Sequence, residues 1–144
     1  MTPGYRLTAN APLRDRNTFG VQALAPWLVE VDDASALGEV MALPQVAESE
    51  SLVIGGGSNL LFAGDAPGAV IAMATHGLRV LSDDGEQARV RADAGVAWHP
   101  LVMWTLEQGL CGLENLALIP GTAGASPIQN IGAYGTEVGE FIAV

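Results

Sequence analysis

The residues best suited to chemistry in this 144-residue chain are a run of glycines followed by two polar side chains, Gly-Gly-Gly-Ser-Asn at residues 55–59. Three successive glycines after a short apolar run let the backbone turn several N–H groups toward one point, and Ser58 and Asn59 add side-chain donors. Such a run can hold a diphosphate without a basic side chain. The alternative that the spacing leaves open is an ordinary tight or flexible turn, because Gly-rich turns are common.

The two familiar nucleotide-binding motifs do not match this run. A dinucleotide fingerprint of the form Gly-x-Gly-x-x-Gly would need glycine at position 60, which is Leu60. The chain has no lysine, so it lacks the lysine of a P-loop and that of a Schiff base. Any phosphate must therefore rest on backbone N–H groups, hydroxyls, side-chain amides or one of the six arginines.

A second unusual run, residues 119–135, mixes glycine, small residues, amides and isoleucine. Such a segment can lie along a flat aromatic ligand, to which it offers hydrogen bonds and close backbone contact. A loop that satisfies its own hydrogen bonds is the alternative. Cys111 is the only cysteine, so neither an internal disulfide nor a thiolate zinc cluster can form, and we predict no metal site.

The charge balance excludes several classes of partner. Sixteen acidic residues stand against six basic ones, which gives a formal net charge of −10. This disfavours binding to nucleic acid or to an anionic membrane surface. The sequence has neither an apolar run of the ~20 residues that cross a bilayer nor a signal-peptide pattern at its start. We therefore predict a soluble, cytoplasmic protein.

The elements that must position the two runs alternate between strands and helices. Apolar runs predict strands over residues 27–31, 51–54 and 69–73. Helical spacing of apolar residues predicts helices over 34–43 and 98–108. The turn sequence Asp-Asp-Gly at 83–85 predicts a hairpin in which residues 78–82 pair with 87–93. This order favours an α+β fold. We expect an irregular segment over residues 1–16 and two α+β subdomains over about 17–75 and 76–144.

The last four residues, 141–144, read as the opening of a strand. Since nothing follows them, we expect a piece of a longer protein whose second subdomain is truncated. An unfinished sheet leaves an open edge, and association of chains through that edge is a further expectation, with the oligomeric state left open.

Two stretches, 112–121 and 126–135, closely resemble the family of UDP-N-acetylenolpyruvoylglucosamine reductases, in its type I form. Asn-Thr-Phe-Gly at 17–20 and Gly-x-Gly-Ser-Asn at 55–59 resemble the other N-terminal landmarks of that family, in the right order, so the resemblance covers residues 14–144. It implies an α+β FAD-binding domain of the vanillyl-alcohol-oxidase-like (PCMH) type, incomplete at its C-terminus.

The resemblance also implies a function. The family binds FAD noncovalently, takes electrons from NADPH and reduces the enolpyruvyl group of a UDP-sugar substrate, as UDP-N-acetylmuramate dehydrogenases of peptidoglycan synthesis. Its catalytic arginine, serine and glutamate lie in segments downstream of residue 144, and its substrate-binding domain is absent here. We therefore expect no catalytic residue in this chain and no activity from it alone. Two alternatives stay open: an FAD- or nucleotide-binding module of another flavoprotein of this fold, and a non-functional fragment.

Residue by residue, the resemblance places the cofactor on both runs. The positions expected at the FAD diphosphate are Gly55, Gly56, Gly57, Ser58, Asn59 and Leu60. Those expected along the flavin and ribityl chain are Pro120, Gly121, Gly124, Ala125, Ser126, Ile128, Asn130, Ile131 and Gly132. Tyr134 is expected near the substrate diphosphate, where its phenol can donate to an anionic oxygen, and a core aromatic beside a turn is the alternative.

Overall fold

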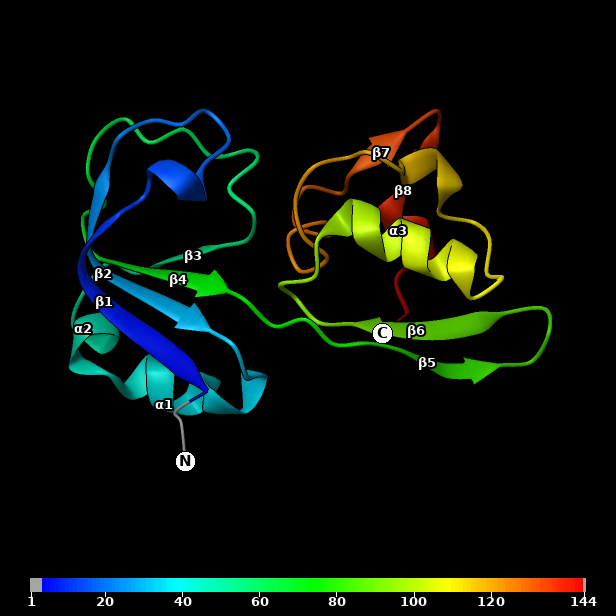
Figure 1. The fold of residues 1–144 in the computed structure, drawn as a ribbon, viewed down its shortest axis with the longest axis horizontal. Helices are drawn as coiled ribbons and strands as arrows, with labels where there is room; N and C mark the ends of the chain where they lie inside the picture. Colours follow the sequence, from blue (N-terminus) through cyan, green and yellow to red (C-terminus); the bar gives the residue numbers. More distant parts are fainter. Residues whose placement is uncertain (1–3, 144) are drawn as a thin grey trace. The chain divides into compact units, whose positions relative to one another are not determined.

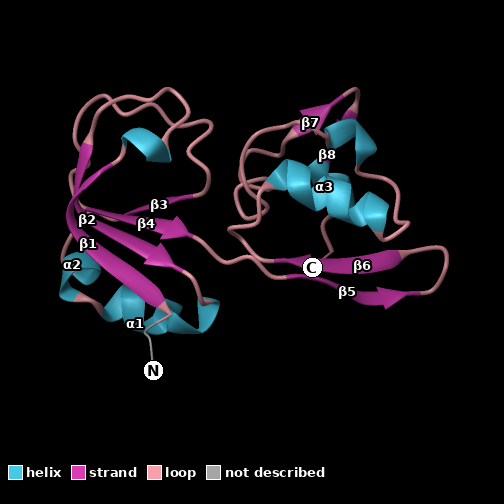
Figure 2. Ribbon diagram, viewed as in Figure 1, coloured by secondary structure: helices cyan, strands magenta, loops and turns pink. Residues whose placement is uncertain are grey.

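The computed structural model describes residues 4–143 of the chain. These fall into two compact units, Met1–Thr75 and His76–Val144, and each is described by itself (Figure 1). The expected mixture of strands and helices is present in both units (Figure 2).

The first unit is built on a four-stranded sheet in the order β1-β2-β4-β3. The antiparallel β1–β2 pair continues into β4 and β3, which run parallel to β2. The strand bounds are β1 Tyr5–Pro12, β2 Leu24–Val31, β3 Leu52–Ile54 and β4 Ala69–Met73. The central strands are near-continuous apolar runs because they are covered on both faces, as parallel strands usually are.

The two faces of this sheet are covered differently. On one face pack the short helices α1 (Leu37–Ala42) and α2 (Pro44–Ala47), which bury Val40 and Val46 against the sheet. Pro44 begins the second helix, and so the single helix predicted over 34–43 ends at Ala42. On the other face the core includes Leu28 of β2 and residues of the loops 13–23 and 55–68.

The N-terminal segment corrects an expectation. Residues 1–16 were predicted to be irregular, but β1 forms over residues 5–12 and pairs along its length with β2. The pairing stabilises β1 through a partner strand that lies about 20 residues away in the sequence, so local pattern alone carries little signal for it.

The second unit combines a hairpin with one longer helix. The predicted hairpin is confirmed as β5 (Leu78–Asp83) and β6 (Ala88–Ala92), and the predicted helix as α3 (Trp98–Glu107). The core of this unit gathers α3 with the inner face of the hairpin. The shorter elements are the 3-10 turns η3 (Glu114–Leu116) and η4 (Val138–Phe141) and the strands β7 (Gly132–Ala133) and β8 (Thr136–Glu137).

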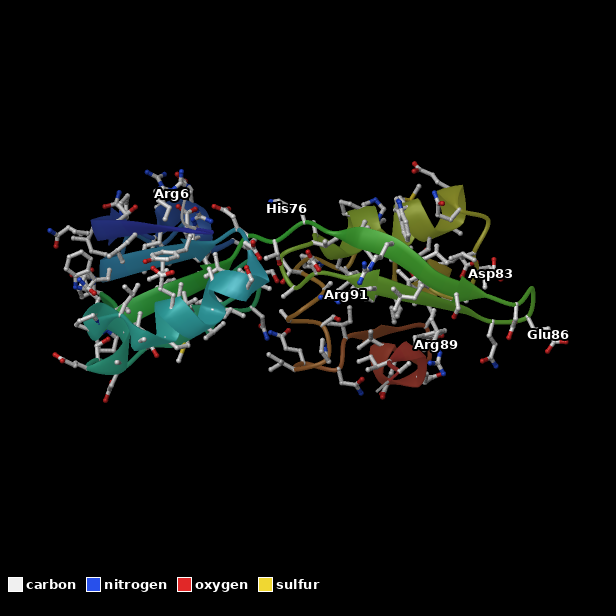
Figure 3. All side chains as sticks on the ribbon, turned by 90° about the horizontal axis from the view of Figure 1, so that it is seen from below. Arg6, His76, Asp83, Glu86, Arg89 and Arg91 are labelled. Carbon is white, nitrogen blue, oxygen red and sulfur yellow. The ribbon has the colours of Figure 1, made fainter. Side chains whose placement is uncertain are left out.

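The outer face of the hairpin carries arginine. Arg79 stands directly across from Arg91 in the strand register. Figure 3 shows Arg89 and Arg91 on this hairpin, with Asp83 and Glu86 toward its turn. Among the described residues β5 and β6 pair only with each other, so their outer edges are open. Association of chains through such an edge stays a prediction.

The C-terminal segment differs from its prediction. Residues 138–141 form a 3-10 turn and 142–143 have no regular structure, so the strand expected over 141–144 is absent from the part of the segment that is described. Glu137 and Glu140 exchange backbone and side-chain hydrogen bonds in a capping box, which favours a helical turn here.

Candidate functional site

The first candidate segment, residues 55–60, leaves the carboxyl end of β3, which is parallel to its neighbour β4. Ligands of open α/β sheets bind outside the carboxyl ends of parallel strands, because the loops there converge beside the sheet. The segment therefore stands where the topology favours a ligand.

Gly57 fixes the shape of this segment. Its φ is +65°, a left-handed conformation that favours glycine. A Cβ added to Gly57 would lie 2.8 Å from the carbonyl carbon of Arg16 and closer still to the carbonyl oxygen. The N–H of Thr18 donates to the Gly57 carbonyl over 3.2 Å. The loop is thus held against residues 16–18 by a contact that only glycine permits.

The donors of this loop have no partner inside the chain. Within the described residues, no hydrogen bond uses the backbone N–H of Gly56, Gly57, Ser58 or Asn59. The side chains of Ser58 and Asn59 are likewise without a partner there. A group of unpaired N–H and O–H donors on a fixed backbone is an arrangement that binds an anion.

Asn17 organises the neighbouring loop, residues 13–21. Its buried side-chain amide donates to the carbonyls of Leu13 (2.8 Å) and Val21 (3.1 Å), and its carbonyl accepts from the Val21 N–H (3.0 Å). The sequence marked residues 17–20 only as a family landmark. The structure gives Asn17 a role, because the loop that it closes is the one that contacts Gly57.

The second candidate segment, residues 120–132, is packed against residues 94–98. The carbonyl of Gly121 accepts from the N–H of Trp98 over 3.0 Å, and the N–H of Gly124 donates to the Ala94 carbonyl over 3.0 Å. A Cβ on Gly124 would lie 2.6 Å from that of Ala94. Glycine is therefore needed at 124 for close backbone approach.

Several polar side chains of this segment have partners within the chain. The Ser126 hydroxyl donates to the Ala123 carbonyl over 2.8 Å. The Asn130 side chain donates to the Glu137 carboxylate over 2.6 Å and accepts from the Gly139 N–H over 3.1 Å. These contacts are what the alternative of a self-satisfied loop predicts, whereas Ile128 is almost fully exposed and unexplained by such packing.

Thr122 is a polar residue of this segment that the sequence analysis did not single out. It is 9% exposed, and its Oγ1 has no hydrogen-bond partner among the described residues. A buried hydroxyl without a partner costs about 1–3 kcal/mol, so such groups usually meet a ligand or water. Its place in a run of glycine and small residues was the available signal.

The side chain of Tyr134 is exposed to solvent and is not packed in the core. It forms with Gly135 the two-residue turn between β7 and β8, with φ values of +54° and +81°. Positive φ at both central residues is typical of a type I′ hairpin turn. Tyr134 is 91% exposed, so the alternative of a core aromatic is wrong.

The structure brings residues 55–60 together in the first unit, and residues 120–132 together with Tyr134 in the second. Within the second unit α3, β6 and residues 138–143 line a half-open pocket of about 590 Å³, which Ser126 also lines. The described part of the chain has no group of three or more His, Cys, Asp or Glu side chains that could hold a metal ion, and no helix there is long and apolar enough to cross a membrane.

Comparison with known proteins identifies the family of the domain. A family model described as "FAD binding domain" matches residues 25–143, which is most of the chain. The chain belongs to this family. The predicted α+β FAD-binding fold is thereby confirmed.

Similar proteins also support the resemblance. The chain is 53% identical over 141 residues to the UDP-N-acetylenolpyruvoylglucosamine reductase of Xanthomonas oryzae pv. oryzae (strain PXO99A), covering 98% of this chain and 40% of that protein. It is 54% identical over 140 residues to the reductase of Xanthomonas campestris pv. campestris (strain B100), covering 97% and 40%.

A solved structure is similar as well. The crystal structure of UDP-N-acetylenolpyruvylglucosamine reductase (MurB) from Thermus caldophilus matches with a TM-score of 0.66 and 26% identity, over 92% of this chain and 44% of that one. The chain thus spans about 40% of the length of the relatives that it matches.

Proposed function

We propose that this chain is the FAD-binding portion of an NADPH-dependent UDP-N-acetylmuramate dehydrogenase, and that it binds FAD noncovalently. The observation that carries the proposal is the set of unpartnered N–H groups at Gly56–Asn59, fixed in place by the contact of Gly57 with residues 16–18. The similarity to reductases at 53% identity supports the choice of cofactor and reaction.

The residues present fit FAD. The loop of residues 55–60 holds the diphosphate through backbone N–H groups and the side chains of Ser58 and Asn59, which stand in for basic groups in a chain without lysine. Residues 120–132 line the flavin and the ribityl chain. The Thr122 hydroxyl, which has no partner among the described residues, offers one more hydrogen bond to that part of FAD. Bound FAD supplies the hydride-transfer chemistry.

The substrate side of the proposal rests on Tyr134. Its exposed phenol stands on the two-residue turn between β7 and β8, where it can donate to a diphosphate oxygen of a UDP-sugar. The enolpyruvyl group of that sugar is the proposed hydride acceptor and NADPH the proposed donor. The setting we propose is cytoplasmic synthesis of peptidoglycan precursors, and with it cell-wall growth and division.

Cofactor binding and turnover are separable in this proposal. The resemblance assigns the family's catalytic arginine, serine and glutamate to segments outside residues 1–144. The chain alone therefore binds FAD without oxidising NADPH in the presence of the enolpyruvyl substrate.

The test is the visible absorption spectrum of the purified chain, followed by titration with FAD and detection by flavin fluorescence. We expect a yellow protein that releases FAD on denaturation, or a colourless one that gains flavin absorbance and thermal stability when FAD is added. Ser58→Ala combined with Asn59→Ala is expected to weaken binding with little loss of stability, since both side chains are partnerless. A folded chain that shows neither flavin absorbance nor a gain in thermal stability at millimolar FAD contradicts the proposal.

A further inference from the structure

A buried carboxylate lies on the loop-covered face of the first unit. Glu30 is on β2, two residues after Leu28, and residues two apart on a strand share a face. Leu28 packs there with Leu13 and Phe62 of the covering loops. The Glu30 side chain is only 9% exposed, so its charge needs partners.

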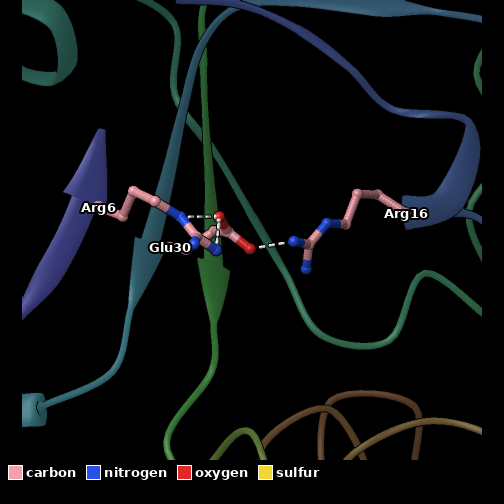
Figure 4. Close-up of polar contacts among 3 residues, drawn as sticks. All are labelled: Arg6, Arg16 and Glu30. Carbon is pink, nitrogen blue, oxygen red and sulfur yellow. Dashed lines mark hydrogen bonds and ion pairs between the residues drawn. The ribbon is translucent and has the colours of Figure 1, made fainter. Parts of the chain in front are cut away.

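Two arginines supply those partners, one on each carboxylate oxygen (Figure 4). Arg6 of β1 donates from Nε to Oε2 over 2.8 Å, and Arg16 donates from Nη2 to Oε1. The Arg6 side chain is 70% exposed and that of Arg16 37%. Of the two ion pairs, the one with Arg16 is thus better shielded from solvent.

Arg16 has a second contact that Arg6 lacks. Its carbonyl group is the surface against which Gly57 packs, at a distance that excludes any Cβ there. Of its C-terminal neighbours in the chain, Asn17 closes the loop through its side chain, and Thr18 donates its N–H to the Gly57 carbonyl. A single residue therefore links the buried carboxylate of the sheet, through its side chain, to the glycine loop, through its backbone.

We propose that the Glu30–Arg16 ion pair is a positioning device for the diphosphate-binding loop. It ties the segment 16–18 to the central sheet, and that segment in turn holds Gly57 in the conformation in which the N–H groups of residues 56–59 have no partner among the described residues. The inference rests on the proposed function, because it assumes that residues 55–60 receive the FAD diphosphate. Neither Glu30 nor Arg16 needs to touch FAD.

Arg6 is the matched control. It binds the same carboxylate, but it lies on the edge strand β1, directly across from Glu30 in the sheet register, and among the described residues it has no hydrogen bond or ion pair with the loop. Losing Arg6 removes a largely exposed charge pair and leaves the connection from Glu30 through Arg16 to Gly57 intact. Losing Arg16 breaks that connection.

The experiment compares Arg16→Met, Arg6→Met and Glu30→Gln in the 144-residue chain. FAD affinity is measured by fluorescence titration, and hydrogen exchange is measured at the Thr18 amide, which donates to Gly57. We expect Arg16→Met and Glu30→Gln each to raise the Kd for FAD about tenfold, as when the competent loop is populated about one-tenth of the time. Both should speed exchange at Thr18, while Arg6→Met changes the Kd less than about twofold. Arg16→Lys should restore part of the affinity.

Val46→Ala distinguishes a positioning role of the ion pair from a general effect on stability. This substitution weakens the packing on the helix-covered face of the same sheet. That variant should lower the melting temperature without changing Thr18 exchange relative to the sheet amides, or the FAD Kd. If it matches Arg16→Met in both readouts, or if Arg16→Met and Arg6→Met behave alike, the positioning role is overturned. If the unmodified chain binds no FAD, the proposed function fails, while the Thr18 exchange comparison still decides whether the ion pair holds the loop.

Discussion

Replacing Gly57 with alanine tests the geometry of the diphosphate loop most directly. The left-handed φ of +65° costs a residue with a Cβ about 1–2 kcal/mol. The new methyl group would also meet the Arg16 carbonyl carbon at 2.8 Å, well inside normal contact distance, so the loop or residues 16–18 must shift. Such overpacking costs a further ~1–3 kcal/mol. We therefore expect Gly57→Ala to lower the free energy of unfolding by about 2–5 kcal/mol.

Gly20→Ala separates the two contributions. Gly20 belongs to the same unit and has nearly the same φ, +64°, but a Cβ there would have no heavy atom within 4 Å. It should lose only the conformational part, about 1–2 kcal/mol. Urea unfolding of both variants, followed by FAD titration at a temperature where each is folded, checks this. Equal destabilisation by the two substitutions, or unchanged FAD affinity in Gly57→Ala, would refute the reasoning.

Three further predictions address other parts of the molecule. Thr122→Val should raise the Kd for FAD about tenfold, by the ~1.4 kcal/mol of one hydrogen bond, without lowering the melting temperature, because Oγ1 has no partner in the chain. Tyr134→Phe should leave FAD affinity and stability unchanged, since the side chain is exposed, and weaken UDP-sugar binding measured by calorimetry. The N–H groups of Gln87 and then Glu86 hold the pKa of Asp84 below the ordinary value of about 3.9. The stabilisation of this turn should therefore be complete above that value and be lost as pH falls through the lower, folded pKa, as a carboxyl NMR titration would show.

The sequence predicted those elements whose signal is local. The hairpin turn at Asp83-Asp84-Gly85, the helix after Trp98 and the apolar strand β4 each carry their own pattern, and each is confirmed within a residue or two. β1 was missed because an edge strand is stabilised by its pairing with β2 rather than by its own alternation. The strand expected over residues 141–144 is absent from the described residues 141–143, because a capping box between Glu137 and Glu140 favours a helical turn.

The same distinction applies to the candidate site. Three glycines in a row indicated a loop that brings backbone close to something, but not which glycine is indispensable. For Gly57 that depends on Arg16, which lies 41 residues earlier and whose carbonyl group leaves no room for a Cβ. Likewise, that the Thr122 hydroxyl lacks a partner can be learned only from what surrounds it.

The chain combines an acidic net charge with a glycine loop, and the two features together determine how it can bind an anion. A lysine-based loop binds phosphate with a full charge, whereas backbone N–H groups offer partial charges that act only at short range and only when aligned. The chain has sixteen acidic residues against six arginines, and Arg6 and Arg16 are both engaged by Glu30, so among the described residues of the first unit Arg14 is the one arginine without an ion pair. The alignment of the donors must then supply the affinity. For this reason the residues that set the shape of the loop, above all Gly57 and the Arg16 segment against which it packs, should matter more to FAD binding than any cation near it.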